Sequence, residues 1–238
     1  YQIAGTDDAT HFFGNGIDDV LWTSTNADGT IATDIWQLAS NGQWTPTPGG
    51  SSPGNHPAGY TVAGTGDWTG DGTDGILWFN ASTGDTDEWK LSNGQWAGSN
   101  DLGTHPANSD GNSYQIAGVG DFFDNGRDGV LWTSVNSDGT VATDIWELNS
   151  SGQWMASQSP GNHPAGYSVV GVGDFTGTGT SDILWFNAST GDTDEWLINN
   201  GQWAGSIDLG THPGSAQIAG VGDFNGAGNA GVLWHASS

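Results

Sequence analysis

The sequence lacks cysteine altogether: none of its 238 residues is Cys, so no disulfide bond holds the fold together. Cations are scarce as well, because Lys90 and Arg127 stand against 27 aspartates and glutamates and the formal net charge is −25. Binding to nucleic acid depends on clustered lysines and arginines that neutralise phosphates, and two cations cannot form such a cluster. The composition therefore excludes a nucleic-acid partner and favours a soluble, acidic surface.

Long apolar segments are also missing. No run approaches the roughly 20 apolar residues that a membrane-spanning helix needs, so we expect no insertion into a membrane. No secretion signal is recognisable, although a mature or trimmed chain would lack one. Helical periodicity is absent, and the apolar runs are short and bounded by Gly, Asn, Asp, Ser and Pro, which is typical of β-strands.

Glycine and tryptophan are abundant, with 41 and 14 residues, and they recur in a pattern. The segment GDWTGDGTDGILW at 66–78 has relatives at 120–132, 173–185 and 222–234, and a looser copy lies at 10–22. Where the chain continues, each copy is followed by a second Trp, a Gly-Gln-Trp string and a His-Pro dipeptide. The chain is therefore a tandem repeat with a period of about 50 residues.

The repeats alternate in type. Odd units share the strings YQIAG and ATDIW, whereas even units share ILWFNASTGDTDEW and NGQWAGS. This alternation suggests that a block of two units was duplicated. The units are residues 1–59, 60–113, 114–166 and 167–216, followed by a half repeat at 217–238.

Each unit contains four expected strands. In the fourth unit they lie at about 167–173, 182–188, 192–199 and 202–209, joined by Asn-Gly and Gly-Asp connectors that signal hairpins. Four antiparallel strands in each repeat predict an all-β fold, a β-propeller of four-stranded antiparallel blades with four full repeats and a half repeat. The small first strand, rich in glycine, suits crowded packing near an axis. Tryptophans of the second and third strands are expected to fill the space between blades.

The half repeat supplies only the first two strands of a blade. Because the N-terminus begins with a first strand, it cannot provide the missing pair. Residues 1–238 are therefore a single propeller domain whose half repeat caps the ring, a fragment of a longer propeller, or a protein that self-associates through the half repeat. A linear β-solenoid is the remaining alternative.

The order Gly-Asp-aromatic-x-Gly-Asp-Gly-x-Asp, followed by an apolar pair and Trp, resembles the FG-GAP/VCBS-type repeats of bacterial surface and secreted proteins. The resemblance covers all four units and the half repeat. It implies a β-propeller similar to that of integrin α-subunits, often with Ca²⁺ in the loop between the first two strands of a blade. It also implies a secreted or cell-surface bacterial protein with a role in adhesion or carbohydrate recognition.

In the second unit, the family's oxygen-donor positions carry three carboxylates and one hydroxyl. Ca²⁺ takes six to eight oxygen ligands, so such a loop can supply part of a site. The third unit has Phe123 at one of these positions, and the other units lose carboxylates further. The alternative is that the aspartates accept backbone N–H groups in a tight turn without metal. The candidate ligands are Asp67, Thr69, Asp71 and Asp74 in the second unit, and Asp121, Asn125 and Asp128 in the third.

Each unit also carries one tryptophan in its Gly-Gln-Trp string. If these rings face solvent, they can stack on sugars while nearby Asn, Asp and Gln bind hydroxyls. If they face a neighbouring blade, they belong to the core. The candidate ligand-binding residues are Trp44, Trp96, Trp154 and Trp203.

Two other patterns suggest chemistry but fit a structural role better. The His-Pro dipeptides lie on different blades, so we interpret them as turns rather than as a metal site. The adjacent carboxylates of Asp87 and Glu88 invite a glycosidase interpretation, but neighbouring residues of a strand point to opposite faces and cannot converge on one bond. We expect a non-catalytic module that binds carbohydrate or an extracellular protein, or alternatively a structural spacer of a larger secreted or surface protein.

Overall fold

The structure is a computed structural model that describes residues 1–5, 11–44, 51–212 and 216–236. Within these ranges the chain forms eighteen β-strands and no helix. It follows that none of the described segments is a helix of the length and apolar character needed to cross a membrane. The expectation of an all-β protein is confirmed.

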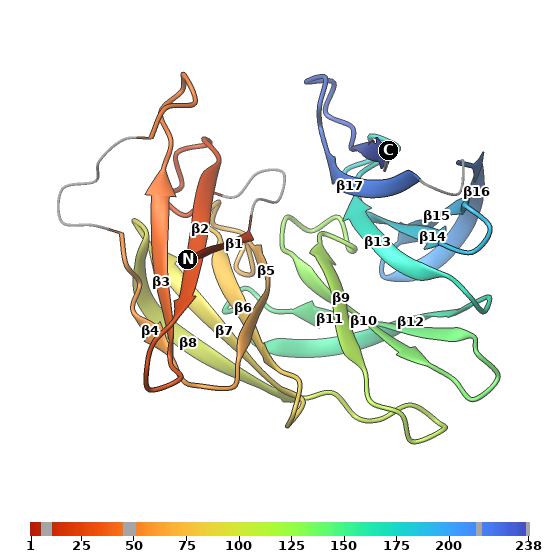
Figure 1. The fold of residues 1–238 in the computed structure, drawn as a ribbon, viewed down its shortest axis with the longest axis horizontal. Coiled ribbons are helices and arrows are strands. Elements are labelled where there is room, and N and C mark those ends of the chain that lie inside the picture. Colours follow the sequence, from red (N-terminus) through yellow and green to blue (C-terminus); the bar gives the residue numbers. More distant parts are fainter. Residues whose placement is uncertain (6–10, 45–50, 213–215, 237–238) are drawn as a thin grey trace. The chain divides into compact units, whose positions relative to one another are not determined.

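The strands form four four-stranded antiparallel sheets and one two-stranded sheet (Figure 1). Strands that follow one another in the chain are neighbours in each sheet, which is the topology of a propeller blade. The first blade contains β1 (Gln2–Gly5), β2 (Asp19–Thr25), β3 (Ile31–Gln37) and β4 (Asn55–His56), and the second contains β5 (Thr61–Gly66), β6 (Gly75–Asn80), β7 (Asp85–Ser92) and β8 (Gln95–Thr104). The third contains β9 (Gln115–Gly120), β10 (Gly129–Val135), β11 (Val141–Leu148) and β12 (Trp154–His163), and the fourth contains β13 (Ser168–Gly173), β14 (Asp182–Asn187), β15 (Asp192–Asn199) and β16 (Gln202–Thr211). The half repeat forms β17 (Ala216–Gly222) and β18 (Gly231–Ala236).

The predicted blade is confirmed strand by strand, and the half repeat is a minor addition to it. In the fourth blade, β13 to β16 begin and end close to the predicted positions. The hairpin between β15 and β16 turns at Asn200 and Gly201, whose φ angles are 50° and 72°. Asn and Gly tolerate this left-handed conformation, which a two-residue hairpin requires.

The chain divides into two compact units, each built mainly from one odd and one even blade. Unit 1 consists of Tyr1–His105 together with Leu148–Trp154, the hairpin tip between β11 and β12. Unit 2 consists of Pro106–Glu147 and Met155–Ser238. The division coincides with the two-unit period of the sequence.

The two units have matching cores. In each, an aromatic residue from the Asp-containing loop and the apolar residues of an odd blade pack against tryptophans on the second and third strands of the following even blade. The prediction that these tryptophans fill the space between blades is therefore confirmed within each unit. The core of unit 1 contains Phe12, Leu21, Ile35, Ile76, Trp78, Trp89 and Leu91, and that of unit 2 contains Phe122, Leu131, Ile145, Ile183, Trp185, Trp196 and Ile198.

The first strands of successive blades pack closely in unit 2, as their small residues predict. A Cβ atom added at Gly118 of β9 would lie 2.5 Å from Cγ2 of Val172 in β13. One added at Gly171 of β13 would lie 2.3 Å from Cγ2 of Val221 in β17. Carbon atoms cannot approach this closely, so glycine is required for the contact between these strands.

Two histidines of the His-Pro dipeptides, His56 and His163, each connect one blade to the next. His163 ends β12, is 1% exposed, and stacks on Trp185 of β14 with 4.1 Å between the ring centroids. Its Nε2 lies 3.1 Å from a carboxylate oxygen of Asp194, and burial lowers the pKa of His163. In unit 1, His56 at the end of β4 stacks on Trp78 of β6 in the same way. These histidines join the fourth strand of one blade to the second strand of the following one.

Candidate functional site

The loop between β5 and β6 is closed around the side chain of Asp67. Its Oδ1 atom accepts hydrogen bonds from the backbone N–H groups of Thr69 (3.2 Å), Gly70 (2.8 Å) and Asp71 (3.2 Å). Its Oδ2 atom accepts the N–H of Gly72 at 2.7 Å. Both carboxylate oxygens therefore serve as acceptors for the backbone of their own loop.

The same arrangement recurs in the later repeats. The first Asp of each loop accepts backbone N–H groups from three residues, the last of them five residues further along the chain. This turn persists even where the other carboxylates of the motif have been lost. The acceptors and their last donors are Asp121 with Gly126, Asp174 with Gly179, and Asp223 with Gly228, each at 2.8 Å.

The other predicted calcium ligands also bond to protein groups. Asp71 accepts the N–H of Thr73 at 2.9 Å, and Asp74 accepts the N–H of His11 from the first blade. Asn125 accepts the N–H of Arg127 at 3.0 Å. Thr69 lies in the same loop as Asp67 and Asp71, whereas Asp74 is buried at the contact with the first blade.

In the described conformation both carboxylate oxygens of Asp67 face backbone N–H groups of their own loop, as the turn interpretation requires. A cation beside Asp67 would face the positive ends of the N–H dipoles that converge on its carboxylate. Across the described ranges, no three His, Cys, Asp or Glu side chains are grouped so that they could hold a metal ion. The arrangement favours the alternative of a tight turn without metal, and calcium binding stays a prediction of the family resemblance.

Calcium dependence can be measured directly. We expect the same unfolding midpoint in millimolar Ca²⁺ and in chelator at equal ionic strength, because only a ligand of the folded state raises it. Asp67→Ala should lower the free energy of unfolding by about 1–3 kcal/mol in both solutions, since the loop loses a charged acceptor. Asp71→Ala, which removes one accepted N–H, is the matched control with a smaller effect. A Ca²⁺-dependent rise that both substitutions abolish would contradict the turn interpretation.

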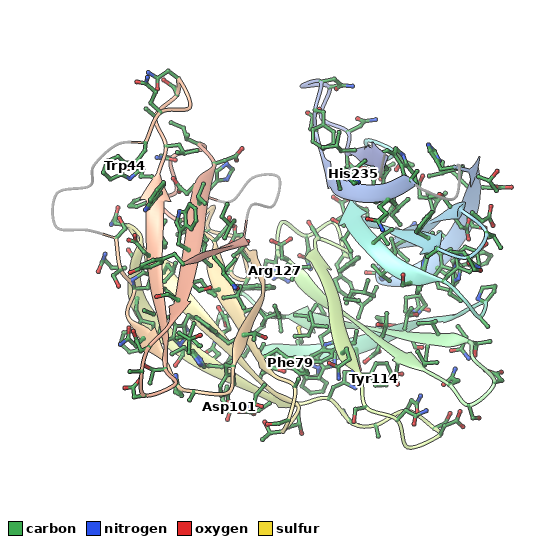
Figure 2. All side chains as sticks on the ribbon, viewed as in Figure 1. Trp44, Phe79, Asp101, Tyr114, Arg127 and His235 are labelled. Carbon is green, nitrogen blue, oxygen red and sulfur yellow. The ribbon has the colours of Figure 1, made fainter. Side chains whose placement is uncertain are left out.

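The four Gly-Gln-Trp tryptophans are surface residues of their blades. Trp96 is the second residue of the outer strand β8 and is 52% exposed, and Trp203 is the second residue of β16 and is 50% exposed. Trp154 is likewise 50% exposed. Trp44, which pairs with Leu38 beyond the end of β3, is 52% exposed (Figure 2). One side of each ring is therefore available to a ligand.

Polar side chains share a face with the tryptophan on the outer strand. The ring of Trp96 lies 6.5 Å from that of buried Trp89, so both side chains are on the same face of the second blade. Trp89 pairs with Ser99, and Asp87 pairs with Asp101, which places Ser99 and Asp101 on this face as well. Both are exposed, and Asp101 lies on β8 (Figure 2).

The fourth blade carries the same group. Trp203 lies 6.4 Å from Trp196, and the pairing of β15 with β16 places Ser206 and Asp208 on the same face. Exposed aromatic, hydroxyl and carboxylate groups are thus repeated at corresponding positions of two blades. We call these two groups the outer-strand lanes: Trp96, Ser99 and Asp101, and Trp203, Ser206 and Asp208.

The adjacent carboxylates of the third strand lie on opposite faces, as predicted from strand geometry. Asp87 faces His56, with 3.0 Å between Oδ2 and Nε2. Glu88 faces the other side, where its Oε2 accepts the side-chain N–H of Asn100 at 2.7 Å. These two carboxylates do not meet at one site.

Glu88 itself is a feature that the strand pattern did not reveal. Its side chain is fully buried, and desolvation raises its pKa to about 7. Glu195, its counterpart in the fourth blade, is 4% exposed, and desolvation raises its pKa to about 7 also. The signal in the sequence was the repeat alignment, because the odd units have buried Ile35 and Ile145 at this position.

No known protein-family model matches the chain, and no curated protein matches it. Among solved structures, it is similar to a chain of the Tc holotoxin pore of Photorhabdus luminescens with a mutated TccC3, at 15% identity and a TM-score of 0.58. The match covers 98% of this chain and 11% of that one. BBS1N in complex with ARL6DN is matched at 15% identity over 92% of this chain and 61% of that one, with a TM-score of 0.41. The first likeness supports the fold, a four-bladed β-propeller, and nothing finer.

Proposed function

We propose that this chain is a non-catalytic, lectin-like module that binds carbohydrate through its outer-strand lanes. The observation that carries the proposal is the recurrence of half-exposed tryptophans beside exposed polar groups. An indole ring offers an apolar face to the apolar face of a sugar, while Ser and Asp side chains can bond to its hydroxyls. The same surface could instead bind an extracellular protein, which would make the chain an adhesive module.

The repetition of the lanes supports binding to polymers or dense surfaces. A single lane is shallow and polar, so its affinity for one sugar residue is expected to be weak. Two such lanes in one chain raise the effective concentration of the second site once the first is occupied. We also propose that the protein is secreted or lies on the cell surface, as the resemblance to FG-GAP/VCBS-type repeats implies.

A glycan array tests the proposal. The unmodified chain should bind neutral glycans, and Trp96→Ala combined with Trp203→Ala should weaken binding at least tenfold, because central aromatic anchors contribute more than about 1 kcal/mol each. Thr104→Ala, at the far exposed end of β8, is the control and should bind normally. If the folded, unmodified chain binds no glycan, the alternative of a structural spacer in a larger protein is supported instead.

Self-association through the half repeat stays a prediction. Phe224 and Leu233 of the half repeat are 60% and 50% exposed. Their counterparts Phe12 and Leu21 in the first repeat are buried against the following blade. The half repeat therefore presents the apolar face that a neighbouring blade covers elsewhere.

A further inference from the structure

A small cavity of about 50 Å³ lies in the second blade, where the Asp67 loop meets β7. Its wall contains the indole of Trp68, the side chains of Asp71 and Thr73 from the loop, and Glu88 and Lys90 from β7. The cavity is separate from the outer-strand lane, because Glu88 and Trp96 lie on opposite faces of the blade. It is therefore a second candidate for ligand binding.

Two polar atoms in the wall of this cavity are buried without a partner. Trp68 is 1% exposed, and its Nε1–H group has no hydrogen-bond acceptor among the described residues. Glu88 is fully buried, and its Oε1 atom likewise has no partner among them. Buried donors and acceptors without partners are costly, so a group that both accepts and donates a hydrogen bond would stabilise this pair. Oε1 of Glu195 in the fourth blade also lacks a partner among the described residues, so the feature specific to the second blade is the polar cavity beside the carboxyl group.

The neighbours of Glu88 hold its carboxyl group in place. Asn100 donates to Oε2 at 2.7 Å and also reaches the carbonyl oxygen of Ser151 at 2.7 Å. Lys90 donates to the side-chain oxygen of Asn100 at 3.4 Å. Oε2 is occupied in this way, both carboxyl oxygens lie beside Gly152 of the hairpin tip, and Oε1 has no hydrogen-bond partner among the described residues.

The fourth blade provides an internal comparison. Residues 76–89 and 183–196 are identical, so Glu88 and Glu195 follow the same second strand and the same hairpin. The positions that differ are those that make the cavity of the second blade polar. Trp68, Asp71, Lys90 and Asn100 of the second blade correspond to Phe175, Thr178, Leu197 and Ile207 of the fourth.

The charges in the wall select the class of guest. The ammonium group of Lys90 and the N–H of Trp68 disfavour a cation, and the carboxyl groups of Asp71 and Glu88 disfavour an anion. A hydroxyl group is neutral and both accepts and donates, so it matches Trp68 Nε1–H and Glu88 Oε1 together. Sites for whole small molecules span about 300–1,000 Å³, so only the end of a larger ligand can enter a cavity of this volume.

We propose that this cavity binds the primary hydroxyl group of a neutral sugar, which makes the second blade the selective site of the chain. The inference rests on the proposed carbohydrate-binding function. The hydroxyl accepts the N–H of Trp68 and donates to Oε1 of Glu88.

The indole N–H signals of protein labelled with ¹⁵N-tryptophan report on this site. Trp68→Phe identifies the Trp68 signal, and Phe is the residue of the fourth blade at that position. The probes are methyl galactoside, methyl glucoside and their 6-deoxy analogues, which lack the primary hydroxyl. We expect a saturable shift of the Trp68 signal with at least one hexoside and none with its 6-deoxy analogue. Lys90→Leu with Asn100→Ile, both residues of the fourth blade, should weaken this response at least tenfold.

The outcomes separate the two proposals. An equal response to a hexoside and its 6-deoxy analogue, or no saturable shift of Trp68, overturns the cavity proposal. If the signals of Trp96 and Trp203 shift while that of Trp68 does not, the lanes bind sugar and the cavity does not. If Trp68 alone shifts, the cavity proposal stands and the lanes are overturned. A midpoint of unfolding within about 3 °C of the unmodified chain shows that the double variant is folded.

Discussion

Trp185→Ala is expected to lower the free energy of unfolding by about 3–5 kcal/mol, the range found when a large buried aromatic side chain is truncated. Trp185 is completely buried in β14 and belongs to the core of unit 2. Its ring also stacks on His163 and packs edge-on against Trp196 at 5.4 Å. Truncation therefore leaves a cavity and removes the partner that fastens β12 to the fourth blade.

Urea denaturation followed by far-ultraviolet circular dichroism measures this loss. Trp203→Ala is the control, because Trp203 is half exposed on the same blade, and we expect a change within about 0.5 kcal/mol. Equal losses from the two substitutions would contradict the assignment of Trp185 to the core and of Trp203 to the surface.

The blades could be predicted from the sequence because their causes are local. The repeat period, the Asn-Gly hairpin at Asn200 and the short apolar runs each specify a strand or a turn within a few residues of the chain. The glycines of the first strands also had a local signal, and Gly118 and Gly171 make the close contacts that small residues allow. The tryptophans on the second and third strands of the even blades are buried between sheets, as predicted, whereas Trp36 on the third strand of the first blade is 39% exposed.

The candidate sites were less predictable because they depend on tertiary neighbours. An aspartate oxygen can bind either a cation or backbone N–H groups, and only the loop conformation shows that Asp67 accepts the N–H groups of its own turn. Similarly, the exposure of Trp96 depends on what covers β8. The alternation of charged and apolar residues could not show that Glu88 is buried, because the covering groups come from the outer strand and from the hairpin tip at Ser151.

The burial of Glu88 makes stability depend on pH. Desolvation raises its pKa from 4.5 to about 7, so the folded state holds a proton that the unfolded state releases. The stabilisation is fully present below pH 4.5 and is lost as the pH rises through 7. A difference of this size corresponds to about 3 kcal/mol, since each pKa unit is about 1.4 kcal/mol.

Glu88→Gln should remove this contribution. We expect the difference in free energy of unfolding between Glu88→Gln and the unmodified chain to change by about 3 kcal/mol in favour of the variant between pH 4.5 and pH 8. Taking the difference cancels other titrating groups, such as His163, whose lowered pKa acts in the opposite direction. Urea denaturation at intervals of pH measures it.

Two further variants serve as a parallel test and as a control. Glu195→Gln should show a change of the same sign in the fourth blade, because desolvation also raises the pKa of Glu195 to about 7. Asp28→Asn is the control: hydrogen bonds from Thr30 lower the pKa of exposed Asp28, so it is ionised in both states across this range and should leave the slope unchanged. If the free energy of unfolding of Glu88→Gln instead changes with pH as that of the unmodified chain does, from pH 4.5 to pH 8, Glu88 is ionised in the folded protein. In that case the buried carboxylate must be stabilised as an anion by the side-chain N–H of Asn100 and by the charge of Lys90.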